Sequence, residues 1–290
     1  MLTPRVLASA VLAKTQVLAA GGAYLFMFKS AHQRNPLAPS TASALSLALL
    51  HDSLGPAHVC HITALDIVTQ FPGLVEWSSV FGMGGYEKTS SDAFDYALYS
   101  RLKKDGSIPS WANKVWLMEY DVAWTGNLPH ILTARFPPDA GFIGYHAVNA
   151  SILPVGDDCP MGKCELWQHT EKRTWPERDG DVFAAQGMLL RLDVRLLDSL
   201  VTHYEHKEWL FNEAAGATVC VIGEADWCTV DWGFKLGHPS LGWSTETNSS
   251  AFCWNYHMHE AEWVATLRGF EERRAADPGI VGRLYHALKF

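Results

Sequence analysis

The amino-acid sequence predicts an α/β fold in which a mostly parallel central sheet is flanked by helices. Two observations lead to this class. Short apolar runs with the length of strands alternate with longer segments in which apolar residues recur at helical spacing, and such alternation is typical of βαβ units. The 290 residues are also 48% hydrophobic, so a large core is available.

The first 22 residues form a segment of their own, ahead of a single predicted domain over residues 23–290. Val6–Phe28 is apolar but carries Lys14, Thr15 and Gln16, whereas a membrane-spanning helix requires about 20 predominantly apolar residues without a central charge. We therefore expect an N-terminal helix, with a weak signal anchor as the alternative. An anchor would imply membrane attachment and a Golgi-type lumen, and its absence would imply a cytoplasmic protein.

The predicted strands are short apolar runs between turn residues or predicted helices. In chain order, we expect strands at Ala23–Phe28, Ala57–Ile62, Val115–Met118, Ala140–Tyr145 and Ala217–Ile222, and a long loop over Gly233–Tyr256.

The predicted helices begin at polar capping residues and carry apolar side chains on one face. Ser40 or Thr41 caps the first helix of the domain, and Asp193 caps a later one, in which apolar residues recur at helical spacing up to Tyr204. In chain order, we expect helices at Thr41–Leu54, from Ser90 to Lys104, near Pro129–Arg135, directly after Asp193, and at Glu260–Ala276.

The triplet Glu119-Tyr120-Asp121 directly follows the apolar run Val115–Met118. Four consecutive apolar residues are typical of a strand buried on both faces, and two carboxylates would be costly in such a core. If the strand continues, residues i and i+2 point to the same face, so both carboxylates would meet at the carboxyl end of the strand, where open α/β sheets bind ligands. Two such oxygen ligands suit a hard divalent cation that holds a phosphate. A solvated strand end followed by a turn is the simpler alternative.

This order of elements, with an apolar strand ending in an acidic-x-acidic triplet, resembles the nucleotide-diphospho-sugar transferases of the GT-A fold. The resemblance covers about residues 20–290 as an order of elements, and its only motif is three residues long. It implies a GT-A-like domain, a nucleotide-sugar donor, and an unknown glycan, lipid or protein acceptor. It also implies a Mn²⁺ or Mg²⁺ cofactor bound by the DxD motif, whose first acid is Glu119 here rather than the commoner Asp.

The resemblance also implies roles for individual residues. Asp121, the last acid of the triplet, is the expected direct metal ligand, with Glu119 and the C-terminal His286 as further ligands. Glu213 follows the helix after Asp193, where such enzymes place an acid that faces the acceptor, and it is the expected catalytic residue. Near the C-terminus, Arg283 and Lys289 are candidate cations for binding the donor diphosphate.

Two functions from other classes stay open. A non-catalytic α/β domain that binds a carbohydrate or a protein, with a decayed metal site, fits the replacement of the first Asp by Glu119. A metal hydrolase could be built on His257 and His259, since this spacing puts two imidazoles on one face of an extended segment, although no HExxH pattern is present. The net charge of −8 argues against a nucleic-acid partner.

The six cysteines are expected to be reduced structural thiols, because a chain of this size does not need disulfides to fold. The alternative is a small disulfide between Cys159 and Cys164, which bracket a short turn. The sequons beginning at Asn149 and Asn248 keep a secretory location open.

Overall fold

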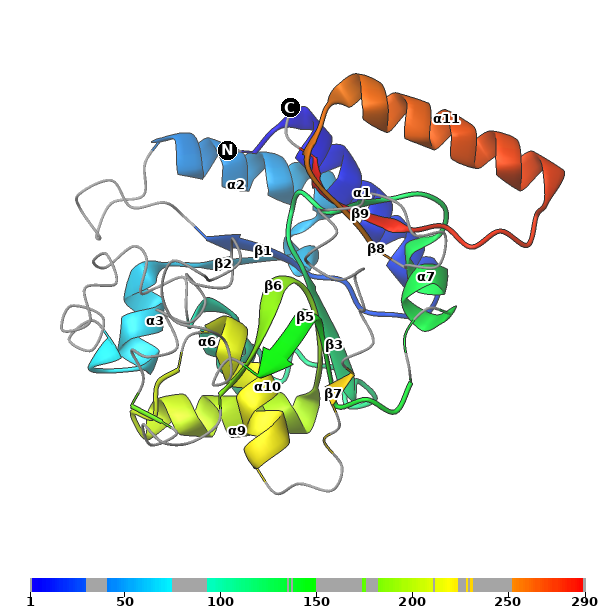
Figure 1. The fold of residues 1–290 in the computed structure, drawn as a ribbon. Helices are drawn as coiled ribbons and strands as arrows, with labels where there is room; N and C mark the ends of the chain where they lie inside the picture. Colours follow the sequence, from blue (N-terminus) through cyan, green and yellow to red (C-terminus); the bar gives the residue numbers. More distant parts are fainter. Residues whose placement is uncertain are drawn as a thin grey trace. The chain divides into compact units, whose positions relative to one another are not determined.

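In a computed structural model, whose helices and strands are drawn in Figure 1, the chain divides into two compact units. Unit 1 comprises Met1–Leu25, Met118–Asp139 and Gly233–Phe290, and unit 2 comprises Phe26–Leu117 and Ala140–Trp232. The chain thus passes between the units several times, and a single domain over residues 23–290 stays a prediction. The structure describes residues 2–29, 41–74, 93–134, 136, 138–149, 174–175, 182–210, 212–223, 228, 230–231 and 252–288.

The larger sheet of unit 2 has four strands, in the order β3 (Lys114–Met118), β6 (Phe183–Asp193), β5 (Phe142–Asn149) and β7 (Val230–Asp231). β5 is antiparallel to β6 and parallel to β7. Two helices, α9 (Val194–Glu205) and α10 (Asn212–Ile222), lie beside this sheet, and α10 packs against both β5 and β6. Their apolar faces supply much of the buried core of the unit.

A second sheet of unit 2 consists of two parallel strands, β1 (Phe26–Lys29) and β2 (Val59–Ile62). Between them the chain forms α2 (Thr41–Leu54) and the short 3-10 helix η1 (Pro56–His58), and after them it forms α3 (Ala64–Gln70) and α6 (Phe94–Lys104). Thr63 caps α3 in a reciprocal arrangement with Asp66, which satisfies the first free N–H groups of this short helix.

Unit 1 contains a three-stranded sheet in the order β4 (Ala123–Trp124), β9 (Leu284–Leu288) and β8 (Phe252–Met258). β4 is antiparallel to β9, and β8 is parallel to it. The described helices of the unit are α1 (Pro4–Ala19), α7 (Leu128–Ala134) and α11 (Glu260–Ala276). Within the described part of the chain, no helix is both long enough and apolar enough to cross a membrane.

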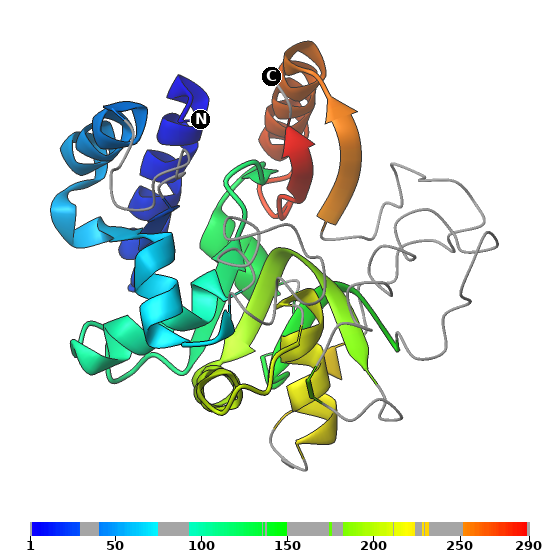
Figure 2. The same ribbon diagram turned by 90° about the vertical axis from the view of Figure 1, so that its left-hand side faces the viewer.

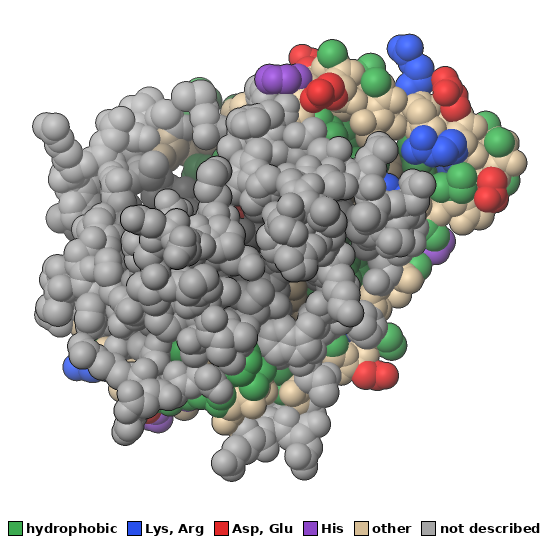
Figure 3. Space-filling model, in the orientation of Figure 1, with side chains coloured by type: hydrophobic (Ala, Val, Ile, Leu, Met, Phe, Trp, Pro, Cys, Tyr) green, Lys and Arg blue, Asp and Glu red, His purple; other side chains and the backbone are tan. Residues whose placement is uncertain are grey.

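The helix α11 lies beside β8 and β9 and is exposed along most of its length (Figure 2). Trp263 packs against Tyr285 with ring centroids 5.5 Å apart, next to Ala123 and Met258 in a small apolar cluster. Phe270 is the buried residue of the helix. Acidic and basic side chains gather over its outer surface (Figure 3), which is typical of a solvated helix face.

The predicted α/β class is confirmed, but the expected central sheet is not found among the described strands. These strands form three small sheets in which parallel and antiparallel pairs are mixed. β3 is an edge strand whose five residues are all partly exposed, so the prediction of burial on both faces is wrong. An apolar run by itself does not show whether a strand has neighbours on both sides.

Two further predictions fail for related reasons. Ala217–Ile222, expected to be a strand, is the second half of α10, because a short apolar run fits a buried helix as well as a buried strand. Gly216 lies against Phe142, and its missing Cβ lets the helix approach the sheet closely. The end of the expected loop Gly233–Tyr256 overlaps β8, and its earlier residues lie outside the described part of the chain.

Candidate functional site

The triplet Glu119–Asp121 forms a turn directly after β3, which we call the acidic turn. The N–H of Val122 donates to the carbonyl oxygen of Glu119 at 3.2 Å and closes this turn. Glu119 and Tyr120 are exposed, whereas Asp121 is partly buried and its Oδ1 is shielded from solvent. The strand therefore does not continue through the triplet, so the condition under which alternation would place both carboxylates on one face is not met, and the alternative of a strand end followed by a turn is the one observed. Their role in metal binding stays a prediction.

The chain after the acidic turn forms β4 and pairs with the C-terminal strand β9. Ala123 lies opposite Tyr285, and Trp124 lies opposite Leu284. Because the two strands are antiparallel, the main chain beyond Tyr285 runs toward the Asp121 end of β4. The main chain of His286 thus lies on the side of the acidic turn. The side chain of His286 and all of Lys289 lie outside the described part of the structure.

The main chain of Arg283 is held at the other end of the same strand pair. Its N–H donates to Thr125 Oγ1 at 3.1 Å, and its carbonyl oxygen accepts from the N–H of Thr125 at 3.0 Å. Thr125 is 1% exposed, so both bonds are sheltered from water. Gly282 packs so closely against the carbonyl group of Thr125 that no side chain could be accommodated there. Two of the predicted site residues, Asp121 and Arg283, therefore flank one strand pair.

Arg5, in the first turn of α1, is a positively charged neighbour of the acidic turn. Burial lowers the pKa of its guanidinium from its ordinary value, and the charges of Asp121 and Glu260 oppose that shift. An arginine stays protonated at neutral pH despite such a shift. Arg5 was missed in the sequence because the only local signal there is the cap of α1, where Thr3 precedes a proline at the first helical position.

Glu213, the expected catalytic residue, lies in unit 2. It is the second residue of α10, and its side chain is outside the described part of the structure. Its placement after α9 agrees with the order of elements that suggested it. A catalytic role for Glu213 stays a prediction.

The alternative metal pair lies at the junction of β8 and α11. His259 is the exposed residue that precedes α11, and its N–H donates to Glu262 Oε2 at 2.9 Å. The side chain of His257 is not among the described ones. Among the described residues, no three His, Cys, Asp or Glu side chains are arranged to hold a metal ion. The contact of His259 is that of a helix cap.

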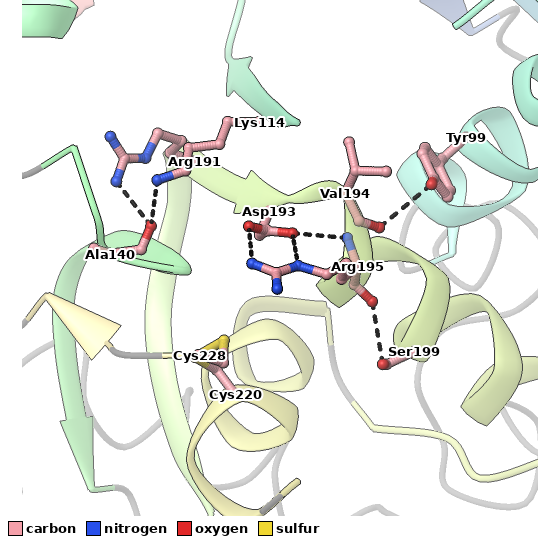
Figure 4. A network of polar contacts seen from close by, with 10 residues as sticks. All are labelled: Tyr99, Lys114, Ala140, Arg191, Asp193, Val194, Arg195, Ser199, Cys220 and Cys228. Atoms are coloured by element: carbon pink, nitrogen blue, oxygen red, sulfur yellow. Dashed lines mark hydrogen bonds and ion pairs between the residues drawn. A yellow bond between two sulfur atoms is a disulfide. The ribbon is translucent and has the colours of Figure 1, made fainter. Parts of the chain in front are cut away.

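A polar network in unit 2 orders the end of β6 and the start of α9 (Figure 4). Asp193 caps α9 and accepts bonds of 2.9 Å from the N–H, Nε and Nη2 of Arg195. Burial would raise the pKa of Asp193, but these bonds and the charges of Arg195 and Lys114 outweigh it and lower the pKa below 3.8. The capping role of Asp193 predicted from the sequence is thus confirmed.

Two cations in the same network converge on one carbonyl group. Arg191 Nη2 and Lys114 Nζ donate to the oxygen of Ala140 at 2.8 Å and 3.3 Å (Figure 4). The buried Arg191 also lies 5.6 Å from the ring centroid of Trp116, a cation–π distance. The next residue, Gly141, accepts a 2.8 Å bond from the N–H of Asp193. These contacts tie β3, β5 and β6 together.

A disulfide joins Cys220, in the last turn of α10, to Cys228 ahead of β7. Cys228 packs directly on Gly141, where a Cβ would lie 2.7 Å from its sulfur. The expectation of reduced thiols is wrong for this pair, because folding brings the two residues to a Cα–Cα distance of 5.2 Å. Cys60 is free and buried, whereas Cys159 and Cys164 lie outside the described residues.

Comparisons with known proteins include a weak structural likeness. No protein-family model matches this chain, and no curated protein matches it in sequence. The crystal structure of mouse xyloside xylosyltransferase 1 in its apo form aligns with 97% of this chain and 92% of its own, at 15% sequence identity and a TM-score of 0.41. A TM-score this low does not establish a common fold.

Proposed function

We propose that this protein is a glycosyltransferase that uses a nucleoside-diphosphate sugar and binds a divalent cation at the acidic turn. The observation that carries the proposal is the pairing of β4 with β9. This pairing places the main chains of Arg283 and His286 beside the segment that leaves the acidic turn, although about 160 residues separate them in sequence. These are the residues to which the resemblance assigns metal and diphosphate binding.

The chemistry of the acidic turn suits a hard cation. A carboxylate oxygen shielded from water, as Asp121 Oδ1 is, requires a cation or hydrogen-bond donors nearby. Carboxylate oxygens are ligands for Mg²⁺, and Mn²⁺ accepts carboxylate and imidazole together. Asp121 is therefore the proposed direct ligand, with Glu119, which is exposed, and with His286 as further ligands.

In the proposed reaction, the residues of this chain bind and orient the donor. When bound, the cation would neutralise negative charge on the departing nucleoside diphosphate. Arg283 and Lys289 would hold the same diphosphate through their positive charges. A base must accept the proton of the acceptor hydroxyl if the anomeric centre is inverted, and Glu213 is the residue we propose for that step.

The direct test is transfer or hydrolysis of a panel of nucleoside-diphosphate sugars by the purified chain, with and without Mn²⁺. Asp121→Asn should lose Mn²⁺-dependent activity while its melting temperature stays close to that of the wild type. Asp139→Asn is the matched control, because it removes the same charge from an exposed position in the same unit. Equal activity of wild type and Asp121→Asn would remove Asp121 from the mechanism.

One observation favours the second candidate, a non-catalytic binding domain with a decayed metal site. Arg5 already brings a positive charge to Asp121, which is the charge that a metal would otherwise supply. Calorimetric titration with Mn²⁺ and with UDP separates the two candidates. Binding without turnover over long incubation would support the binding domain, and Mn²⁺-dependent turnover would exclude it.

We also propose that the protein folds in an oxidising compartment such as a secretory lumen. The support is the Cys220–Cys228 disulfide, because such bonds persist in secretory compartments and are rare in the reducing cytosol. Alkylation of the native protein followed by peptide mapping tests the bond. Recovery of both cysteines as alkylated free thiols from the protein's own cell would contradict this location.

A further inference from the structure

The side chain of Gln16, in the last turn of α1, holds residues 124–128, which run from the last residue of β4 to the first residue of α7 and which we call loop 124–128. Its Oε1 accepts from the indole Nε1–H of Trp124 at 3.1 Å and from the N–H of Leu128 at 2.8 Å. Its Nε2 donates to the carbonyl oxygen of Gly126 at 3.2 Å. One carboxamide thus makes hydrogen bonds to three groups of loop 124–128, which lies more than 100 residues away in sequence.

These bonds satisfy groups that water does not reach easily. Trp124 is 5% exposed and Leu128 is 3% exposed, so their N–H groups depend on Gln16 as an acceptor. Removing an acceptor from a buried donor is more costly than removing both partners together. Gly126 has φ of +83°, a left-handed conformation that the surrounding contacts must maintain.

The loop held by Gln16 is also the junction at which β9 begins. Thr125 exchanges two hydrogen bonds with Arg283, as described above. Gly126 lies against Gly282 and against the ring of Phe270 from α11, with only 3.0 Å between that ring and a Cβ placed on the glycine. A shift of loop 124–128 would therefore shift β9 relative to the acidic turn.

We infer that Gln16 is a positioning residue for the proposed metal site, an inference that rests on the proposed function. Gln16 fixes loop 124–128, this loop fixes the start of β9, and β9 places the main chain of His286 beside the segment that follows Asp121. Gln16 itself touches neither the acidic turn nor β9 through any of its three described bonds. Its effect on the site passes through the loop.

The test compares Gln16→Met with wild type in two measurements. Methionine has a similar length but makes none of the three bonds. Titration with Mn²⁺ alone should show that Gln16→Met binds the ion about tenfold more weakly than the wild type does. This factor is at the lower end of the loss of metal affinity that follows from changing groups that support metal ligands. Amide hydrogen exchange should be faster at 122–125 and 283–286 and unchanged in β5 and β6 of unit 2, which also shows that the variant is folded.

Two further variants sharpen the result. Trp124→Phe removes one of the three bonds and should change both measurements in the same direction by a smaller factor. Thr15→Ala, on the same helix, removes a hydroxyl that bonds within α1 to the carbonyl oxygen of Val11, and it should behave as wild type. Unchanged exchange at 283–286 in Gln16→Met, or an equal effect of Thr15→Ala, would overturn the inference.

The same measurements distinguish a failure of the proposed metal site from a failure of the role of Gln16. If wild-type protein binds no Mn²⁺, the metal site fails whatever Gln16 does, and the assignment of Gln16 to such a site fails with it. Hydrogen exchange then decides alone whether Gln16 positions β9. Mn²⁺ binding by wild type that Gln16→Met retains in full would leave the proposed function standing and overturn the role of Gln16.

Discussion

Replacing Gly282 by alanine is expected to force β9 away from the loop that follows β4. A Cβ at this position would overlap the carbonyl oxygen of Thr125 and would lie 2.6 Å from its carbonyl carbon. Carbon atoms in favourable contact are about 3.5–4.0 Å apart. The two backbones must therefore separate by at least roughly 1 Å, and neither is a flexible side chain that could move aside.

The energetic consequence follows from the two bonds that bridge this contact. Thr125 and Arg283 exchange hydrogen bonds of 3.0 Å and 3.1 Å, and a shift of roughly 1 Å would stretch both beyond hydrogen-bond range. Each lost bond lowers stability by about 1 kcal/mol, and by up to about 3 kcal/mol where a buried group is left unsatisfied. We expect Gly282→Ala to lower the free energy of unfolding by about 2–4 kcal/mol.

Urea denaturation followed by circular dichroism and tryptophan fluorescence would measure this loss. Gly269→Ala is the matched control, because this glycine lies within α11 and its added Cβ would meet only Arg273 Nη1 at 3.6 Å. Alanine at position 269 should stabilise the helix by up to about 1 kcal/mol, so the same substitution should change the free energy of unfolding in opposite directions at the two sites. Gly282→Ala with wild-type stability would refute the close packing of β9 on Thr125.

Two predictions concern unit 2. Replacing Cys220 and Cys228 together by alanine should lower the free energy of unfolding by about 2.5 kcal/mol, because the disulfide closes a loop with a sequence separation of 8 and so limits the entropy of the unfolded chain. Urea denaturation of the oxidised proteins measures this loss, and equal urea midpoints for the wild type and the variant would contradict it. Asp193→Asn should lower the urea midpoint at pH 7, because asparagine still caps α9 but cannot pair with Arg195. Folding lowers the pKa of Asp193, so the ionised carboxylate stabilises the folded state fully above pH 3.8 and loses this effect as the pH falls further. The difference in urea midpoint between the wild type and Asp193→Asn should therefore become smaller below pH 3.8. A deficit of constant size from pH 7 to pH 3 would rule out the ionised carboxylate as its source.

Helix boundaries were the features most accessible from sequence. α2 and α11 have the predicted bounds, and Asp193 caps α9 as expected. Caps act within three residues of a helix end, and the apolar stripe of a helix repeats within one or two turns. Both signals are therefore contained in the segment that they describe. The acidic turn was found in the same way, as an abrupt change from apolar to charged residues.

Long-range pairing decided the geometry of that turn. The run Val115–Met118 was predicted as a central strand, but β3 is an edge strand and the chain turns as soon as it ends. The pairing of β4 with β9 joins residues about 160 positions apart, and nothing in either segment specifies the other. In place of two carboxylates that converge on one strand face, the structure has a turn beside a strand pair.

The sequence by itself determined the bounds of α2 and α11, the cap of α9, and which short segment carries the acidic motif, because each of these depends on neighbouring residues. Only the tertiary structure decided that Ala217–Ile222 is helical, that Cys220 and Cys228 are bonded, and that Arg5 and Gln16 of α1 serve the segment 121–128. Those features arise from contacts between distant segments, whose energies depend on packing that no local pattern records.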